Sequence, residues 1–83
     1  MKTKVNDENR VDYIMEYESG DISDIDMLHL FANLIETGMA WSLQGHYGRN
    51  AQAFIEQDWI DNKGIMNVGK IMEFKLDGEK RNV

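Results

Sequence analysis

Residues 22–39 constrain the fold more than any other part of the chain, because they carry the local signals of one long helix. Ser23 can accept a hydrogen bond at the start of that helix, with Asp26 three residues on, as in a capping box. Gly38 supplies a residue free to take positive φ, which commonly ends a helix. The apolar residues between them form a broad stripe: Leu28, Phe31 and Ile35, widened by Met27, Leu30 and Leu34. The sequence therefore predicts a helix over residues 24–37 that is buried over much of its girth.

Shorter helical elements are expected on both sides of this one. A helical pattern covers residues 7–19, and a further turn is expected over residues 40–44, each followed by a glycine. Another helix should begin near residue 47 or 50 and end at about Trp59. Its core face would be Ala51, Phe54, Ile55 and Trp59, with Tyr47 one turn earlier.

The C-terminal part of the chain shows a different periodicity. Met72, Phe74 and Leu76 alternate with charged residues, which predicts a short strand or an extended arm. A lone strand would be disordered, folded back on the helices, or paired with a second copy of the chain in a homodimer. The expected fold is mainly α, a small bundle of three to four short helices with an extended or β-like arm. We expect a helical domain over residues 1–62 and an arm or tail over residues 63–83. The predicted core is Ile14, Leu28, Phe31, Leu34, Ile35, Leu43, Phe54, Ile55 and Trp59.

The composition narrows the cellular setting. The 83 residues contain no cysteine, so neither a disulfide nor a thiolate metal site supports the fold. No uninterrupted apolar run is long enough to cross a bilayer, and the first ten residues are too polar for a signal peptide. We therefore expect a small protein that stays in the cytoplasm.

The charge is unevenly distributed along the chain. The formal net charge is −6, and no lysine or arginine occurs between Val11 and Gly48. That interval carries seven carboxylates: Asp12, Glu16, Glu18, Asp21, Asp24, Asp26 and Glu36. A surface that binds nucleic acid needs clustered lysines and arginines, so this part of the chain is a poor candidate for one. The charge favours a partner protein with a basic surface.

Four of these carboxylates, Glu18, Asp21, Asp24 and Asp26, lie close together in the sequence. They can complement the dipole at the start of the helix over residues 24–37, or they can form an acidic contact face for the partner. The glycine and the distal glutamate of a calcium loop are missing at the required spacing, so no metal is expected.

Catalysis has little support in the sequence. The two histidines, His29 and His46, are far apart and have no cysteine to complete a zinc site. Ser42 lies near His46, but the residues around it do not resemble a nucleophile elbow or a triad. We expect no enzyme activity, no catalytic residues and no cofactor.

The central stretch Trp41–Asn50, "WSLQGHYGRN", is the best candidate for a contact site. Tryptophan, tyrosine and arginine dominate the energetically important positions of protein interfaces. The predicted partner-binding residues are Gln44, His46, Tyr47, Arg49 and Trp41. Two alternatives remain open: Trp41 closes the core, and Arg49 pairs with an internal carboxylate.

A helix-turn-helix is the alternative from another functional class. The helix that contains this stretch would carry Arg49, Asn50 and Gln52, which could contact base edges. Its single basic residue and the acidic helices before it make DNA binding the weaker hypothesis.

Sequence motifs between Asp12 and Ile60 resemble a family of small uncharacterised proteins encoded mainly by tailed bacteriophages. The pattern is Tyr-Glu-x-Gly, then Phe-x-x-Leu-Ile-x-x-Gly, then Ala-Trp-x-Leu-Gln-Gly-x-Tyr-Gly-Arg-x-Ala. It falls here on Tyr17, Glu18, Gly20, Phe31, Leu34, Ile35, Gly38, Ala40, Trp41, Leu43, Gln44, Gly45, Tyr47, Gly48, Arg49 and Ala51. The chain departs from it at Gln57–Asp58 and after Asn62.

The resemblance implies a phage origin more than it implies a mechanism. A small acidic phage protein without a catalytic site is expected to act early in infection, in the cytoplasm of the infected bacterium. There it would bind a host protein and redirect or inhibit it, or block a defence system.

Overall fold

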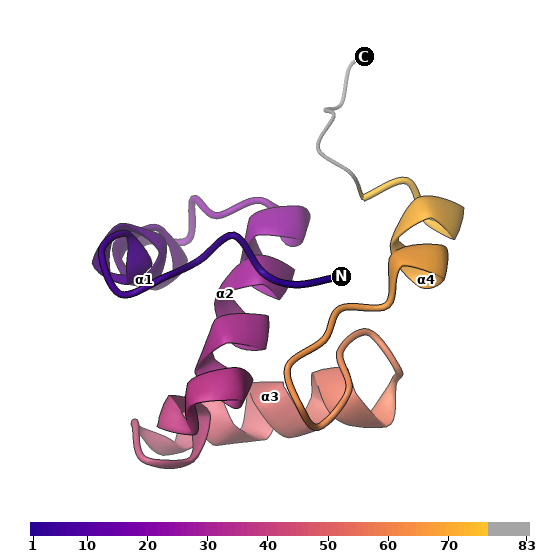
Figure 1. The fold of residues 1–83 in the computed structure, drawn as a ribbon. Helices are drawn as coiled ribbons and strands as arrows, with labels where there is room; N and C mark the ends of the chain where they lie inside the picture. Colours follow the sequence, from indigo (N-terminus) through magenta and orange to yellow (C-terminus); the bar gives the residue numbers. More distant parts are fainter. Residues whose placement is uncertain (77–83) are drawn as a thin grey trace.

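The computed structural model describes residues 1–76 and contains, within them, four α-helices and one short 3₁₀ helix (Figure 1). In chain order these are α1 (Arg10–Ser19), α2 (Asp24–Thr37), η1 (Met39–Trp41), α3 (Gly45–Glu56) and α4 (Val68–Glu73). No strand occurs in this part of the chain, which has one isolated antiparallel bridge between Ile60 and Met66. The mainly α fold class is therefore confirmed.

Helix α2 forms the centre of the fold, as predicted. The Ser23 hydroxyl accepts a hydrogen bond from the N–H of Asp26 at 3.2 Å, and Gly38 ends the helix with a φ of 82°. Every residue from Leu28 to Ile35 is buried. In Figure 1, α1 lies on one side of α2, α3 crosses its end, and the chain before α1 crosses it nearer its start.

The predicted core is confirmed where it falls on α2. Leu28, Phe31, Leu34 and Ile35 are buried. The other predicted core residues are partly buried and pack against this core: Ile14, Leu43, Phe54, Ile55 and Trp59. Three buried positions further along the chain were missed, Ile60, Met66 and Ile71. They show that the segment after α3 contributes to the same core.

The helices flanking α2 differ from the predicted bounds for local reasons. Helix α1 begins at Arg10 because the Asn6 side chain binds the N–H groups of Glu8 and Asn9 and holds a turn there. Helix α3 begins at Gly45, earlier than expected. It ends at Glu56, two residues before Asp58 adopts a positive φ of 65°.

The strand predicted from the alternation of Met72, Phe74 and Leu76 is wrong for the described residues. Met72 lies in α4, and Phe74 and Leu76 follow its last turn. The Asn67 side chain caps this helix by accepting a hydrogen bond from the N–H of Lys70 at 3.1 Å. Ile71 is buried and fixes the helix to the core. The rest of the predicted arm, residues 77–83, lies outside the described residues, and pairing of arms in a homodimer stays a prediction.

The N-terminal segment, residues 1–9, has a structural role that the sequence analysis did not anticipate. Two α2 side chains one turn apart, His29 and Asn33, bind its backbone. The N–H of Lys4 donates to His29 Nδ1 at 3.1 Å, and Asn33 Nδ2 donates to the carbonyl of Val5 at 3.2 Å. Val5 itself is buried. The segment therefore covers a side of α2 that would otherwise face solvent.

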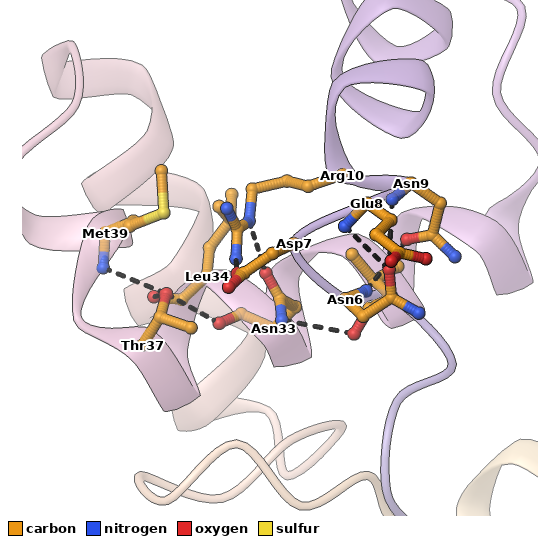
Figure 2. A network of polar contacts seen from close by, with 10 residues as sticks. Asn6, Asp7, Glu8, Asn9, Arg10, Asn33, Leu34, Thr37 and Met39 are labelled. Carbon is orange, nitrogen blue, oxygen red and sulfur yellow. Dashed lines mark hydrogen bonds and ion pairs between the residues drawn. The ribbon is translucent and has the colours of Figure 1, made fainter.

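Figure 2 shows the centre of this polar contact. Asn33 is buried and also accepts a hydrogen bond from Arg10 Nε at 2.8 Å, while Arg10 pairs with Asp7. One asparagine side chain thus connects α2 to the N-terminal segment and to the start of α1. Buried polar groups are costly without partners, so this network fixes the position of the segment.

Candidate functional site

The central stretch divides into two groups of side chains. One group, His46, Tyr47 and Asn50, turns toward α1 and the core. The other, Trp41, Gln44 and Arg49, lies on the exposed side of η1 and α3. The predicted site is therefore not one continuous set of contact residues.

Tyr47 belongs to the core. It is only 4% exposed, and its ring lies 5.4 Å from that of Tyr17 and 6.1 Å from that of Phe31, between ring centroids. Its hydroxyl donates a hydrogen bond to the Glu18 carboxylate at the end of α1. Burial, together with that carboxylate, raises the pKa of the Tyr47 hydroxyl. This corrects the expectation that Tyr47 anchors a partner, because its ring is already enclosed by its own chain.

His46 and Asn50 extend the same contact between α3 and α1. The His46 ring lies 4.3 Å from the Tyr47 ring and is nearly parallel to that of Tyr17, with 19° between the planes. Asn50 Nδ2 donates to the Tyr17 hydroxyl at 2.6 Å, and that hydroxyl is 3.4 Å from His46 Nδ1. These side chains bind one another, and Asn50 in particular is not free to read a base edge.

Trp41, Gln44 and Arg49 surround two glycines of α3, and we call these five residues the Trp41 surface. Trp41 is 52% exposed, and its ring approaches to 3.8 Å from the point where a Cβ on Gly48 would lie. The Arg49 guanidinium folds back over the first turn of the helix, 3.0 Å from the corresponding point on Gly45. Gly45 and Gly48 are three residues apart and share a face of the helix. The arginine therefore lies over Gly45, and the tryptophan ring lies beside Gly48.

The alternatives left open for these residues can now be decided. With half of its surface exposed, Trp41 does not close the core. Arg49 is exposed and forms no ion pair with any carboxylate of residues 1–76. Gln44 precedes α3 and is exposed, and its side chain makes no capping hydrogen bond. Within residues 1–76, the side chains of these three residues form no hydrogen bond and no ion pair.

The four carboxylates predicted as a contact face have separate roles. Glu18 binds Tyr47, and Asp21 accepts a hydrogen bond from the Ser19 hydroxyl at 3.3 Å. Asp24 and Asp26 both lie in the first turn of α2, where they complement its dipole. Asp26 is also paired with Lys4, at 3.2 Å between Nζ and Oδ1, and this carboxylate raises the pKa of the Lys4 amine.

The remaining titratable groups give no metal site in the described part of the chain. Within residues 1–76, no group of three or more histidine, aspartate or glutamate side chains is placed to hold an ion. His29 is buried under the N-terminal segment. Its pKa is lowered mainly by this burial and, to a smaller extent, by the nearby charge of Lys4. None of the described helices has the length and apolar character needed to cross a membrane. The absence of catalysis stays a prediction.

Comparison with known proteins identifies a family but no characterised relative. No curated protein and no solved structure matches the chain significantly. Residues 3–77 match one protein family, and this range includes the N-terminal contact, all four helices and the Trp41 surface. The chain therefore belongs to the family described as a domain of unknown function, DUF7417.

Proposed function

We propose that the protein acts by binding another protein, without catalysis, and that the Trp41 surface makes the central contact. The observation that carries this proposal is the exposure of Trp41 beside Arg49, on helices whose inner faces are packed. A half-exposed tryptophan leaves a large apolar area in water, which is unfavourable unless a partner covers it.

The geometry of the surface suits recognition. Tryptophan and arginine, the residue types at positions 41 and 49, are two of the three types enriched among the interface positions that dominate binding energy. The absence of side chains at Gly45 and Gly48 lets the Arg49 guanidinium and the Trp41 ring lie close against the helix. The partner would offer an apolar pocket to the indole and an acceptor to the guanidinium.

The proposed partner is a host bacterial protein with a basic surface. Two observations support this choice: the acidic charge of residues 11–48, and the resemblance of the central motif to phage-encoded proteins. Charge of one sign over a surface speeds the encounter with an oppositely charged partner. The protein would act in the cytoplasm of the infected cell, inhibiting or redirecting its target by occupying it.

The test begins with a photoreactive amino acid placed at position 41, and separately at position 72 on α4 as a control for exposure. Each full-length protein is irradiated in a bacterial lysate, and crosslinked proteins are identified by mass spectrometry. The proposal expects a host protein that crosslinks from position 41 and not from position 72.

The same host protein, once purified, is then titrated with Trp41→Ala, Arg49→Ala and the control Met72→Ala. Loss of a dominant interface residue costs about 2 kcal/mol or more, which is about a 30-fold rise in Kd. Met72 is also exposed, so its substitution should leave Kd within about twofold. If Trp41→Ala and Arg49→Ala both bind the host protein with unchanged Kd, the central contact lies outside the Trp41 surface. Retention on DNA at low salt, with no protein captured, would favour the DNA-binding alternative.

A further inference from the structure

The outer face of α1 carries an apolar pair that nothing in the described chain covers. Val11 is 61% exposed and Met15 is 64% exposed, and the two lie one turn apart. The opposite side of the helix packs on the core through Tyr13, Ile14 and Tyr17. The packing of α1 against the other described residues therefore leaves Val11 and Met15 uncovered.

A line of carboxylates runs beside this apolar pair. Asp12 and Glu16 are exposed, are also one turn apart, and each follows one of the two apolar residues in sequence. The three ion pairs formed among residues 1–76 do not involve either of them. By contrast, the N-terminal lysines neutralise acids of α2: Lys2 pairs with Glu36 at 3.3 Å and Lys4 with Asp26.

The helix dipole accounts for Asp12, which lies in the first turn of α1, but not for Glu16. Glu16 lies in the last turn of α1, which contains no basic residue. A carboxylate at that end faces the negative pole of the helix, which is unfavourable. Glu18, in the same turn, is offset by the hydrogen bond from Tyr47, but Glu16 has no such partner among the described residues. An exposed apolar pair beside two carboxylates that form no ion pair within residues 1–76, one of them at the unfavourable end of the helix, suits a binding surface.

We propose that this α1 surface, Val11, Asp12, Met15 and Glu16, is a docking site for a basic amphipathic helix of a partner protein. Two apolar residues one turn apart on the partner would pack on Val11 and Met15, as helices do when they recognise one another through i, i+4 positions. Lysines or arginines beside them would meet Asp12 and Glu16. The inference rests on the proposed function only in that the same partner would carry the helix.

The probe is a synthetic helical peptide of leucine and lysine, with the leucines on one face. It is titrated into the full-length ¹⁵N-labelled protein while amide chemical shifts are followed. We expect the largest shifts at residues 11–16 and a Kd that rises with salt, because exposed charges contribute to the contact. Two control peptides separate the contributions: one has glutamate in place of lysine, and one has the same composition in scrambled order.

Variants locate the site. The double substitution Asp12→Lys, Glu16→Lys should raise the Kd of the peptide at least about tenfold, because the α1 surface would then repel the lysines of the peptide. Met15→Ala should raise it about fivefold, by removing part of the apolar contact. Glu73→Lys on α4 is the matched charge control and should change it less than twofold.

The outcome separates this inference from the proposed function. Equal binding of the scrambled peptide, or shifts spread over every acidic residue, would overturn the docking site and show only general attraction of charge. Trp41→Ala should leave peptide binding unchanged. If the peptide binds at α1 while crosslinking from position 41 captures nothing, the role of the Trp41 surface fails and the α1 site stands. If the peptide does not bind, the α1 site fails whatever position 41 captures.

Discussion

Gly64 offers the sharpest test of how the C-terminal segment is attached to α2. Its φ is +90°, and a Cβ at this position would lie 2.6 Å from the carbonyl oxygen of Ala32 and 2.8 Å from Cβ of Glu36. These obstacles are backbone atoms and a Cβ in the C-terminal half of α2, which cannot move away cheaply. We therefore expect Gly64→Ala to be among the most destabilising single substitutions in the chain.

The expected loss of folding free energy in Gly64→Ala has two parts. A side chain in the left-handed region costs about 1–2 kcal/mol, and forcing an extra carbon into a packed contact costs about 1–3 kcal/mol. The sum, about 2–5 kcal/mol, is a large share of the roughly 4–12 kcal/mol expected for a domain of 83 residues. The variant should be partly unfolded or close to it.

Gly38→Ala is the matched control. Gly38 also has a positive φ, of 82°, but nothing lies within 4 Å of the position of its Cβ. This variant should lose only the conformational part, about 1–2 kcal/mol. The difference between the two variants, about 1–3 kcal/mol, isolates the clash with α2.

The measurement is urea unfolding followed by far-ultraviolet circular dichroism and by tryptophan fluorescence. For a small domain the difference corresponds to about 1–3 M in the urea midpoint. Equal midpoints for Gly64→Ala and Gly38→Ala would refute the reasoning, since they would show that the loop around Gly64 does not press against α2.

Three further predictions concern the polar contacts. Because the pKa of His29 is lowered from its ordinary 6.5, the unfolded chain binds more protons as the pH falls below that value. The free energy of unfolding should therefore fall from pH 7 toward the lowered pKa, and His29→Asn, which keeps an acceptor, should flatten this slope in urea unfolding at several pH values. Tyr47→Phe removes the hydrogen bond to Glu18 and should lower the free energy of unfolding by about 1–2 kcal/mol in the same assay. A decrease under about 0.5 kcal/mol, the size of a neutral surface change, would show that the bond contributes little. Asn33→Ala leaves the Val5 carbonyl without its partner and should speed amide hydrogen exchange in residues 1–9 more than in α3, with uniform exchange counting against a local role.

The sequence predicted α2 to its terminal residues because its signals are local. The Ser23 cap, the apolar stripe and Gly38 all lie within the element that they define. The strand at Met72 was wrong because alternation over five residues is too short to exclude a helix. A helix forms there because Asn67 caps its first turn and Ile71 is buried in the core. In the sequence, Asn67 was the signal that could have indicated this helix.

The candidate site was predicted only in part, because residue type does not determine exposure. Trp41 and Tyr47 are both large aromatic residues of one short stretch, yet one lies in solvent and the other in the core. The helical periodicity had already placed Tyr47 one turn before Ala51 on the core face, and that was the better guide. The contacts of His29 with the N-terminal segment could not be predicted, because they join residues 25 or more positions apart.

The attachment of the N-terminal segment also sets an order for folding during synthesis. The amino group of Met1 donates to the carbonyl of Met66 at 2.7 Å, and the N–H of Met66 donates to the carbonyl of Met1 at 2.8 Å. The two residues are 65 positions apart, so this pairing must wait until residue 66 has left the ribosome. Until then α1 and α2 can associate, but the C-terminal half of α2 lacks the loop around Gly64 that later packs on it. The contacts of Lys4 and Val5 with α2 can form earlier, whereas the pairing of Met1 with Met66 completes the fold only when nearly all of the described residues have been made.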